Sequence, residues 1–590
     1  MHLTPDLMAR IADTMRWRAD FGALVAVSRA WYNACHRRAS QLGPEGAFVR
    51  AGAWRAGLLC ARRVSPDGWC ELVGATPASV RAVARGVRTS AAPGDLVLWG
   101  RSTELAAQLR VASQLDGIEQ LDVRALEKPS GRRSARDVQR LIGGVRGLRR
   151  LMLEFWPIDP AVLGGALGRV ASTLQELHLY DCALGGPNCL TQLGLARLRR
   201  LRVLDLTYNP IGDSPDDFNR LGDVPQLERL FVGWVGAGSS PQGVPTLLKA
   251  VGRMSSLQCL SLAGNDLANE AGNAERLAAT LEKCTQITTM SLCLNGLGSR
   301  PGEGAWLARG LAALPRLTTL FLSHNPLAEY ADAMPAIADA LQSKPLAVLH
   351  LDTTQLGVRA TDSGCAARAV SSLCARRLFV RDNFVGRHRG DVGVLAQALS
   401  ANLVVLDLRD NLVGRHVYLK DVLALLARLT HLTELDLSCN FLGDEQPMRL
   451  FEPLVPPRLR TFRVARNSLG RGPGEIGALC TLVAAMPELE TLDLGSNAIE
   501  RYSDVAQLAA ALRCSVNIQD VELADNPMWR DLGAAATLVR RLGERAPTLV
   551  LGSHDAALAL RRTDHPGLVR ILKDLAARHM PVESHEVATH

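Results

Sequence analysis

Aliphatic residues recur at fixed spacing along most of the chain. In 432–442, leucine occupies positions 1, 4, 6 and 11, and asparagine occupies position 9. The same spacing starts again at Leu201, Leu257, Leu317 and Leu489. The first apolar positions of successive units are 118, 148, 174, 201, 227, 257, 287, 317, 346, 375, 403, 432, 459, 489 and 518. Each unit alternates briefly, as a strand does, and then continues at helical spacing, so the pattern predicts a repeated strand–turn–helix unit.

Helices are expected in the second half of each unit. Leu307, Leu311 and Leu314 follow helical spacing, and Pro315 and Pro487 each lie two residues before the next strand, where a helix should stop. Successive starts are mostly 28 to 30 residues apart, with extremes of 26 and 30, which leaves room for a full α-helix.

The pattern L-x-x-L-x-L-x-x-N-x-L resembles the leucine-rich repeat, and the unit length resembles the ribonuclease-inhibitor class. The resemblance implies an α/β fold, a right-handed solenoid over 118–552 with about 15–16 units. Strands in a ladder lie about 4.8 Å apart and packed helices about 8–10 Å apart, so we expect a horseshoe with parallel strands on the concave face and helices on the convex face. The recurring asparagines should turn inward and bond backbone groups.

Residues 1–40 predict two short amphipathic helices. One apolar face contains Leu7, Met8, Ile11 and Met15, and a second contains Phe21, Leu24, Val25, Ser28 and Trp31. The matching residues Leu3, Asp6, Leu7, Met8, Ile11, Val27, Ser28, Arg29 and Trp31 resemble an F-box, although the proline, Pro5, falls one position late.

The F-box resemblance implies docking on the Skp-type adaptor of a cullin–RING complex. The expected adaptor-binding residues are Leu3, Pro5, Leu7, Met8, Ile11, Val27 and Trp31. The alternative is a helical cap that shields the first repeat.

The segments that flank the array are less regular. We expect 41–117 to be a helical connector with a degenerate first repeat or N-cap, including a helix over 47–63 and a strand at Val97–Trp99. A cap helix at Pro566–Arg578 and a tail should fill 553–590.

Composition limits the class of protein. The 590 residues contain 13 cysteines with no C-x-x-C pair, which indicates buried, reduced thiols and a cytoplasmic or nuclear protein. No apolar run reaches membrane-spanning length, so no membrane is expected. The net charge is +8, and residues 1–63 hold ten Arg against four acidic residues. This excess indicates a solvated surface more readily than an acidic partner, and we expect a monomer that binds no nucleic acid.

No catalytic constellation is present. The phosphate-loop, H-E-x-x-H and G-x-S-x-G patterns are missing from the sequence. We therefore expect no enzymatic activity, no catalytic residue, no metal and no cofactor.

Function is expected on the outward positions of the strands, namely 3, 5, 7 and 8. The candidate partner-binding residues there are Tyr180, Tyr208, Phe231, Trp234, Phe321, Phe379, Arg381, Asp407, Arg409 and Asp436. The alternatives are local packing for the aromatic residues and ion pairs between strands for the charged ones.

These features favour a protein–protein interaction scaffold, the substrate-recognition subunit of an SCF-type ubiquitin ligase that holds a protein substrate on the concave face. The alternatives are a binding, inhibitor or sensor scaffold without ligase association, and a GTPase-activator-like regulator.

Overall fold

The computed structural model describes most of the array. The described residues are 147–357, 375–417, 419–443, 455–515 and 517–530, with shorter pieces at 61–64, 69–73, 95–100, 119–125, 142, 145, 538 and 548–550. The chain forms two compact units, one reaching Leu297 and including Arg309–Leu317, the other containing Gly298–Ala308 and continuing from Thr318. Each unit is described separately.

The strands of the first unit form a ladder that is parallel except at its start, where β1 and β2 pair antiparallel. Leu177, Leu204, Leu230 and Leu260 follow one another in register. The strands are β1 Ala61–Val64, β2 Trp69–Val73, β3 Asp95–Gly100, β4 Gln120–Ala125, β5 Arg150–Glu154, β6 Glu176–Tyr180, β7 Val203–Asp205, β8 Arg229–Phe231, β9 Cys259–Ser261 and β10 Thr289–Ser291.

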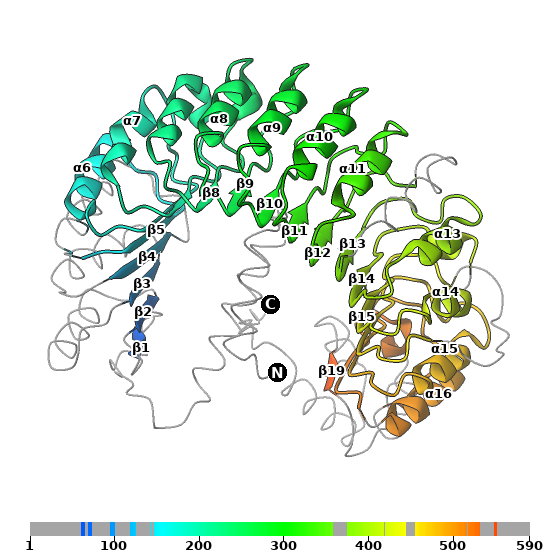
Figure 1. Cartoon of the computed structure of the whole chain (residues 1–590). Coiled ribbons are helices and arrows are strands. Elements are labelled where there is room, and N and C mark those ends of the chain that lie inside the picture. The colour runs from blue at the N-terminus through cyan, green and yellow to red at the C-terminus, as the bar shows by residue number, and fades with distance from the viewer. Residues whose placement is uncertain are drawn as a thin grey trace, which may run out of the picture. The chain divides into compact units, whose positions relative to one another are not determined.

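Helices of the first unit lie on one side of these strands (Figure 1). They are α6 Pro160–Val170, α7 Cys189–Leu193, α8 Gly243–Val251 and α9 Asn273–Leu281, with 3-10 turns η1 Leu195–Arg197, η2 Ile211–Asp213, η3 Pro215–Asp223 and η4 Ala237–Ser239. The repeats that start at 174 and 201 are 27 and 26 residues long. They contain five residues of α-helix and the nine-residue η3, so the expected full helix is wrong for these two repeats.

The second unit repeats the same arrangement. Its strands are β11 Thr319–Phe321, β12 Val348–His350, β13 Arg377–Phe379, β14 Val405–Asp407, β15 Glu434–Asp436, β16 Thr461–Arg463, β17 Thr491–Asp493, β18 Asp520–Glu522 and β19 Thr548–Val550, all parallel. The helices are α11 Ala333–Leu341, α13 Asp391–Ala398, α14 Leu419–Leu426, α15 Glu475–Ala484 and α16 Tyr502–Cys514, with turns η5 Val413–Arg415 and η6 Pro527–Arg530. Helix α10, Glu303–Ala312, has residues in both units.

The predicted repeat is confirmed in register. Every strand from β4 to β18 begins two residues after the first apolar position that the sequence pattern gives. The strand leucines face the helices and are buried, as at Leu204 and Leu435, which are both 0 % exposed. The fold is a leucine-rich-repeat solenoid of parallel strands and helices.

The asparagines turn inward as expected. Nδ2 of Asn209 donates to the carbonyl oxygens of Leu179 at 2.6 Å and Leu206 at 2.8 Å. Its Oδ1 accepts from the backbone N–H groups of Cys182 and Leu184. The side chain therefore satisfies backbone groups of two successive repeats, which would otherwise be buried without partners.

The residue before the asparagine position has a left-handed backbone in every repeat from 148 to 518. Its φ is positive in Phe155, Asp181, Tyr208, Trp234, Gly264, Leu294, His324, Thr353, Asp382, Asp410, Cys439, Arg466, Ser496 and Asp525. This conformation ends the strand and turns the following side chain toward the core. It disfavours side chains with a β-carbon by roughly 1–2 kcal/mol.

One expectation for the connector is wrong. Ala61–Val64 is strand β1, not the end of a helix over 47–63, and it pairs with β2. The sequence Ser65-Pro66-Asp67-Gly68 between them is rich in turn formers, and Trp69–Val73 alternates as a strand does. The strand expected at Val97–Trp99 is confirmed as β3. The F-box-like residues 1–40 and the cap helix at Pro566–Arg578 lie outside the described residues.

Candidate functional site: an aromatic ladder on the strand face

Four aromatic rings line the strand face of the first unit, and we call Phe155, Tyr180, Tyr208 and Trp234 the aromatic ladder. Ring centroids are 5.8 Å apart between Phe155 and Tyr180, 5.3 Å between Tyr180 and Tyr208, and 5.5 Å between Tyr208 and Trp234. The last pair is stacked, with 8° between the ring planes. Sequence analysis named three of these residues. It missed Phe155, whose place before the inward-turning residue of its repeat was the available signal.

The repeat geometry positions these rings. Tyr180 ends β6, whereas Phe155, Tyr208 and Trp234 occupy the left-handed position that follows a strand. The same position in the next repeat is Gly264, and a β-carbon there would lie 2.4 Å from atoms of the Trp234 ring. Trp234 is thus held between Tyr208 and Gly264, with 39 % of its surface exposed.

Carboxylates surround the middle of the ladder. Burial raises the pKa of Tyr180 above its ordinary value, and the charges of Tyr208, Glu154, Asp205 and Asp181 raise it further. Burial and Asp181 also raise the pKa of Tyr208. Both phenols therefore remain neutral hydrogen-bonding groups beside a negative potential.

Phe231, the remaining aromatic candidate of the first unit, lies half-buried on β8. In the second unit, Phe321 and Phe379 enclose His350 between them. Ring centroids are 4.6 Å apart for Phe321 and His350, and 4.0 Å apart for His350 and Phe379. Nδ1 of His350 lies 3.4 Å from Oδ2 of Asp352, which also accepts from the Ser323 hydroxyl. Sequence analysis did not connect His350 with these two rings.

Two of the charged candidates of the second unit, Arg381 and Asp407, form an ion pair. Nε of Arg381 donates to Asp407 at 2.6 Å, and Nε of Arg409 lies 3.2 Å from Asp410. Asp407 and Asp436 are buried, at 4 % and 8 % exposed. Each accepts a hydrogen bond from the backbone N–H two residues ahead, as do Asp205, Asp493 and Glu522. The carboxylates at this position of the repeats therefore accept hydrogen bonds from backbone N–H groups just beyond the end of each strand.

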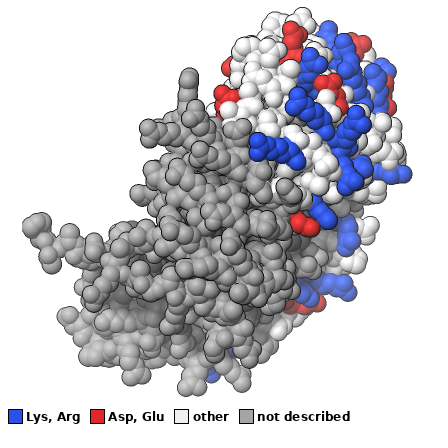
Figure 2. All heavy atoms as spheres, turned by 90° about the vertical axis from the view of Figure 1, so that its left-hand side faces the viewer, with Lys and Arg blue, Asp and Glu red and all other residues white. Residues whose placement is uncertain are grey.

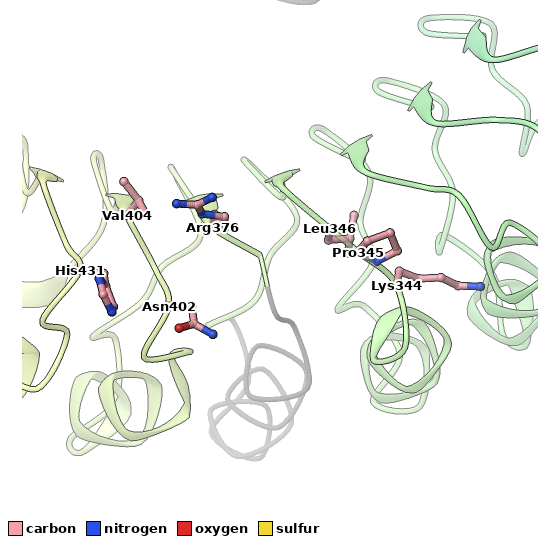
Figure 3. A pocket seen from close by; sticks show the side chains of 7 residues that line it. All are labelled: Lys344, Pro345, Leu346, Arg376, Asn402, Val404 and His431. Atoms are coloured by element: carbon pink, nitrogen blue, oxygen red, sulfur yellow. The ribbon is translucent and has the colours of Figure 1, made fainter.

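A hollow of about 450 Å³ lies at the start of β12 to β15 (Figure 3). Its lining residues are Lys344, Pro345, Leu346, Arg376, Asn402, Val404 and His431. The ammonium group of Lys344 points away from Arg376 and His431 in this view, so the basic groups do not converge on one point.

Basic side chains gather on another surface, the described part of the face in Figure 2. Independently of this view, the segment before β7 contains four exposed arginines, Arg197, Arg199, Arg200 and Arg202. Arg202 pairs with Glu228 at 3.2 Å.

The described residues contain no group of three or more His, Cys, Asp or Glu side chains that could hold a metal ion. The described cysteines are free thiols, and Cys182, Cys189, Cys259, Cys284 and Cys293 are buried. Burial raises the pKa of Cys259 to about 12 and that of Cys284 to about 11, so these thiols stay protonated. Within the described helices, no segment combines the length and the apolar character that crossing a membrane requires.

Two segments of the chain match a known family of repeats. Residues 198–214 and 428–445 match the family described as Leucine Rich repeat. No curated protein matches the sequence.

Solved structures with similar backbones include the leucine-rich repeat-containing protein LegL7 from Legionella pneumophila, at 17% identity over 51% of this chain and 94% of that chain, with a TM-score of 0.35. An internalin from Listeria monocytogenes is 17% identical over 58% of this chain and 80% of that chain, with a TM-score of 0.34. The Rad7 and Elc1 complex in yeast is 13% identical over 77% of this chain and 89% of that chain, with a TM-score of 0.39. The matched segments and the repeated strand and asparagine geometry make this chain a leucine-rich-repeat protein.

Proposed function

We propose that this protein is a protein-binding scaffold, the substrate-recognition subunit of an SCF-type ubiquitin ligase. The strand face would hold a substrate protein, and residues 1–40 would dock on a Skp-type adaptor within a cullin complex. The ligase chemistry would belong to other subunits.

The aromatic ladder is the observation that supports partner binding. Large aromatic side chains anchor interfaces because each removes about 150–250 Å² from water when a partner covers it. Here they stand on the outward side of a sheet whose inward side is filled by leucines. Adaptor docking rests on the F-box resemblance of Leu7, Ile11 and Trp31.

The adaptor part is tested by binding of purified Skp-type adaptor to the full chain. We expect the wild type to bind and Leu7→Asp/Ile11→Asp to lose binding, because charges would enter the apolar face of the first helix. Ala9→Asp is the matched control, since helical spacing would place Ala9 on the opposite side of the expected helix. Equal binding by wild type and double variant, or binding by neither, would remove the adaptor role and leave the scaffold without ligase association.

A further inference from the structure

We infer that the aromatic ladder binds an arginine-bearing segment of its protein partner, with the guanidinium groups beside Asp181 and Asp205 and their aliphatic stems along the rings of Tyr180, Tyr208 and Trp234. This inference rests on the proposed scaffold function and names the chemistry of the partner.

Three rings of the aromatic ladder occupy backbone positions with positive φ. Bulky side chains are rare at positive φ, yet Phe155, Tyr208 and Trp234 have φ of 56°, 61° and 55°. Other repeats place Asp382, Asp410, Ser496 and Asp525 there, but also Leu294, Thr353 and Arg466, so the left-handed backbone belongs to the repeat itself. What distinguishes this surface is that aromatic rings occupy the position in three of the four successive repeats that start at 148, 174, 201 and 227.

The rings of the ladder are also rigid. Tyr208 and Trp234 stack within 8° of parallel, and Gly264 supports the far side of the indole. The rings therefore lose little conformational entropy when a partner covers them. Their faces are turned toward neighbouring rings in this pair, so the contact surface is formed by ring edges, above all those of Trp234, which is 39 % exposed. Such a surface suits a long aliphatic stem with a polar end.

Charge also favours an arginine-bearing partner. Glu154, Asp181 and Asp205 lie at the finishing ends of β5, β6 and β7, beside the ladder. Arg150 starts β5, about 13 Å along the strand from Glu154 at 3.3 Å per residue. That distance exceeds the Debye length of about 8 Å at physiological salt, so Arg150 screens Glu154 weakly. Arg229 pairs in register with Val203, two residues before Asp205, and lies nearer to that carboxylate.

Two other basic residues lie on neighbouring strands. Arg124 pairs in register with Glu154. His178 pairs in register with Asp205, its Nδ1 lies 3.6 Å from Oδ2 of Asp205, and it is only 4 % exposed.

Arginine suits this surface better than lysine. Its guanidinium is planar, remains charged and forms paired hydrogen bonds with carboxylates, while its weaker hydration eases contact with aromatic rings. A neutral or acidic partner would leave the carboxylates facing apolar or like-charged groups.

The test is fluorescence anisotropy of the full-length protein with labelled peptides of alternating Arg and Gly. Matched peptides replace Arg by Lys, by citrulline, which has the same shape without charge, or by Glu. We expect the Arg peptide to bind tightest, the Lys peptide more weakly, and the other two to lose binding. Tyr208→Ala/Trp234→Ala should weaken the Arg peptide about tenfold or more.

Two controls separate binding from folding. Tyr502→Ala removes an aromatic residue that is 54 % exposed on α16, and it should leave peptide binding unchanged. Tyr208→Phe keeps the ring and should retain binding, with circular dichroism showing that every variant is folded.

The inference is overturned if the citrulline peptide binds as tightly as the Arg peptide, or if the ladder variant binds the Arg peptide as the wild type does. It is also overturned if a single-stranded oligonucleotide of the same length binds more tightly and is lost in the ladder variant. Protein partners captured by the wild type but not by the ladder variant, without peptide binding, would keep the scaffold function and remove the arginine assignment.

Discussion

Trp234 lies over Gly264 so closely that a β-carbon on Gly264 would come within 2.4 Å of the indole ring. The glycine also has a φ of +66°, a conformation that most side chains avoid. A missing side chain in one repeat therefore fixes an aromatic ring of the preceding repeat.

Gly264→Ala should displace Trp234 from its stack with Tyr208 and weaken Arg-peptide binding, while the fold is retained. The added methyl group would clash with the indole ring, so the ring must move, and the left-handed backbone adds a stability loss of about 1–2 kcal/mol. Ring displacement is measured by fluorescence quenching, with Trp234→Phe identifying the Trp234 signal. Unchanged quenching and unchanged peptide affinity would contradict this view of the stack.

Asn440→Ala should destabilise the second unit. Nδ2 of Asn440 donates to Leu408, Leu437 and Ser438, and its Oδ1 accepts from Val413. An unsatisfied buried backbone group costs roughly 1–3 kcal/mol, so the loss should be at least that large.

Hydrogen exchange should locate the effect of Asn440→Ala in β14 and β15, because each repeat depends mainly on its neighbours. Asn402→Ala removes an exposed asparagine and serves as the control. Equal protection of β14 and β15 in both variants would refute a structural role for this asparagine.

His178 should make stability depend on pH. Its ring lies 3.5 Å from Glu176 and 3.6 Å from Asp205. Burial lowers the pKa of His178, but hydrogen bonds with Asp205 and Glu176 raise it by more, so the net pKa lies above its ordinary value. The protonated ring favours the folded state, so its contribution is complete below the unfolded pKa of about 6.5. That contribution is lost as the pH rises through the folded pKa.

Urea unfolding from about pH 5.5 to 8.5 measures this linkage. The wild type should lose stability relative to His178→Gln as the pH rises. Parallel curves for the two proteins would show that His178 does not change its protonation on unfolding.

Asp493 should make the free energy of unfolding depend on pH, and replacing it with asparagine should remove that dependence. Burial raises its pKa, while the backbone N–H of Gly495 lowers it, and the net pKa is above the ordinary value. Ionised Asp493 therefore disfavours folding at neutral pH, and this cost disappears as the pH falls through the folded pKa toward about 3.9.

Asp493→Asn keeps an oxygen that can accept from Gly495 and removes the charge. The variant should be more stable than the wild type at neutral pH, with the difference shrinking in acid when thermal midpoints are compared. A variant less stable at neutral pH would mean that the charge, not the hydrogen bond, is what closes the strand.

Much of this fold was predictable because its rule repeats. Leu432, Leu435 and Leu437 predict the strand and its buried side, and Asn440 predicts the turn that follows. Where a repeat lacks the asparagine, another residue takes the same position and faces inward. Cys182 is one such residue, and its Sγ donates to the carbonyl oxygen of Leu153 at 3.3 Å. Strand β1 was missed because it belongs to no repeat.

The site was predictable only in part. Outward positions identified Tyr180, Tyr208 and Trp234, but ring stacking depends on contacts between residues of successive repeats that are 28 and 26 positions apart in the sequence. The support by Gly264 is invisible in sequence because a glycine in a turn has many explanations. The pairing of Arg381 with Asp407 likewise depends on the side-chain positions in neighbouring strands.

We propose that two separate surfaces bind proteins, one at residues 1–40 and one at the aromatic ladder. Quantitative affinity purification of wild type, Leu7→Asp/Ile11→Asp and Tyr208→Ala/Trp234→Ala, with Ala9→Asp and Tyr502→Ala as controls, tests it most directly. The first variant should lose a Skp-type adaptor and cullin while keeping a substrate protein, and the second should lose the substrate while keeping the adaptor. Identical sets of bound proteins for the wild type and both variants would contradict the account.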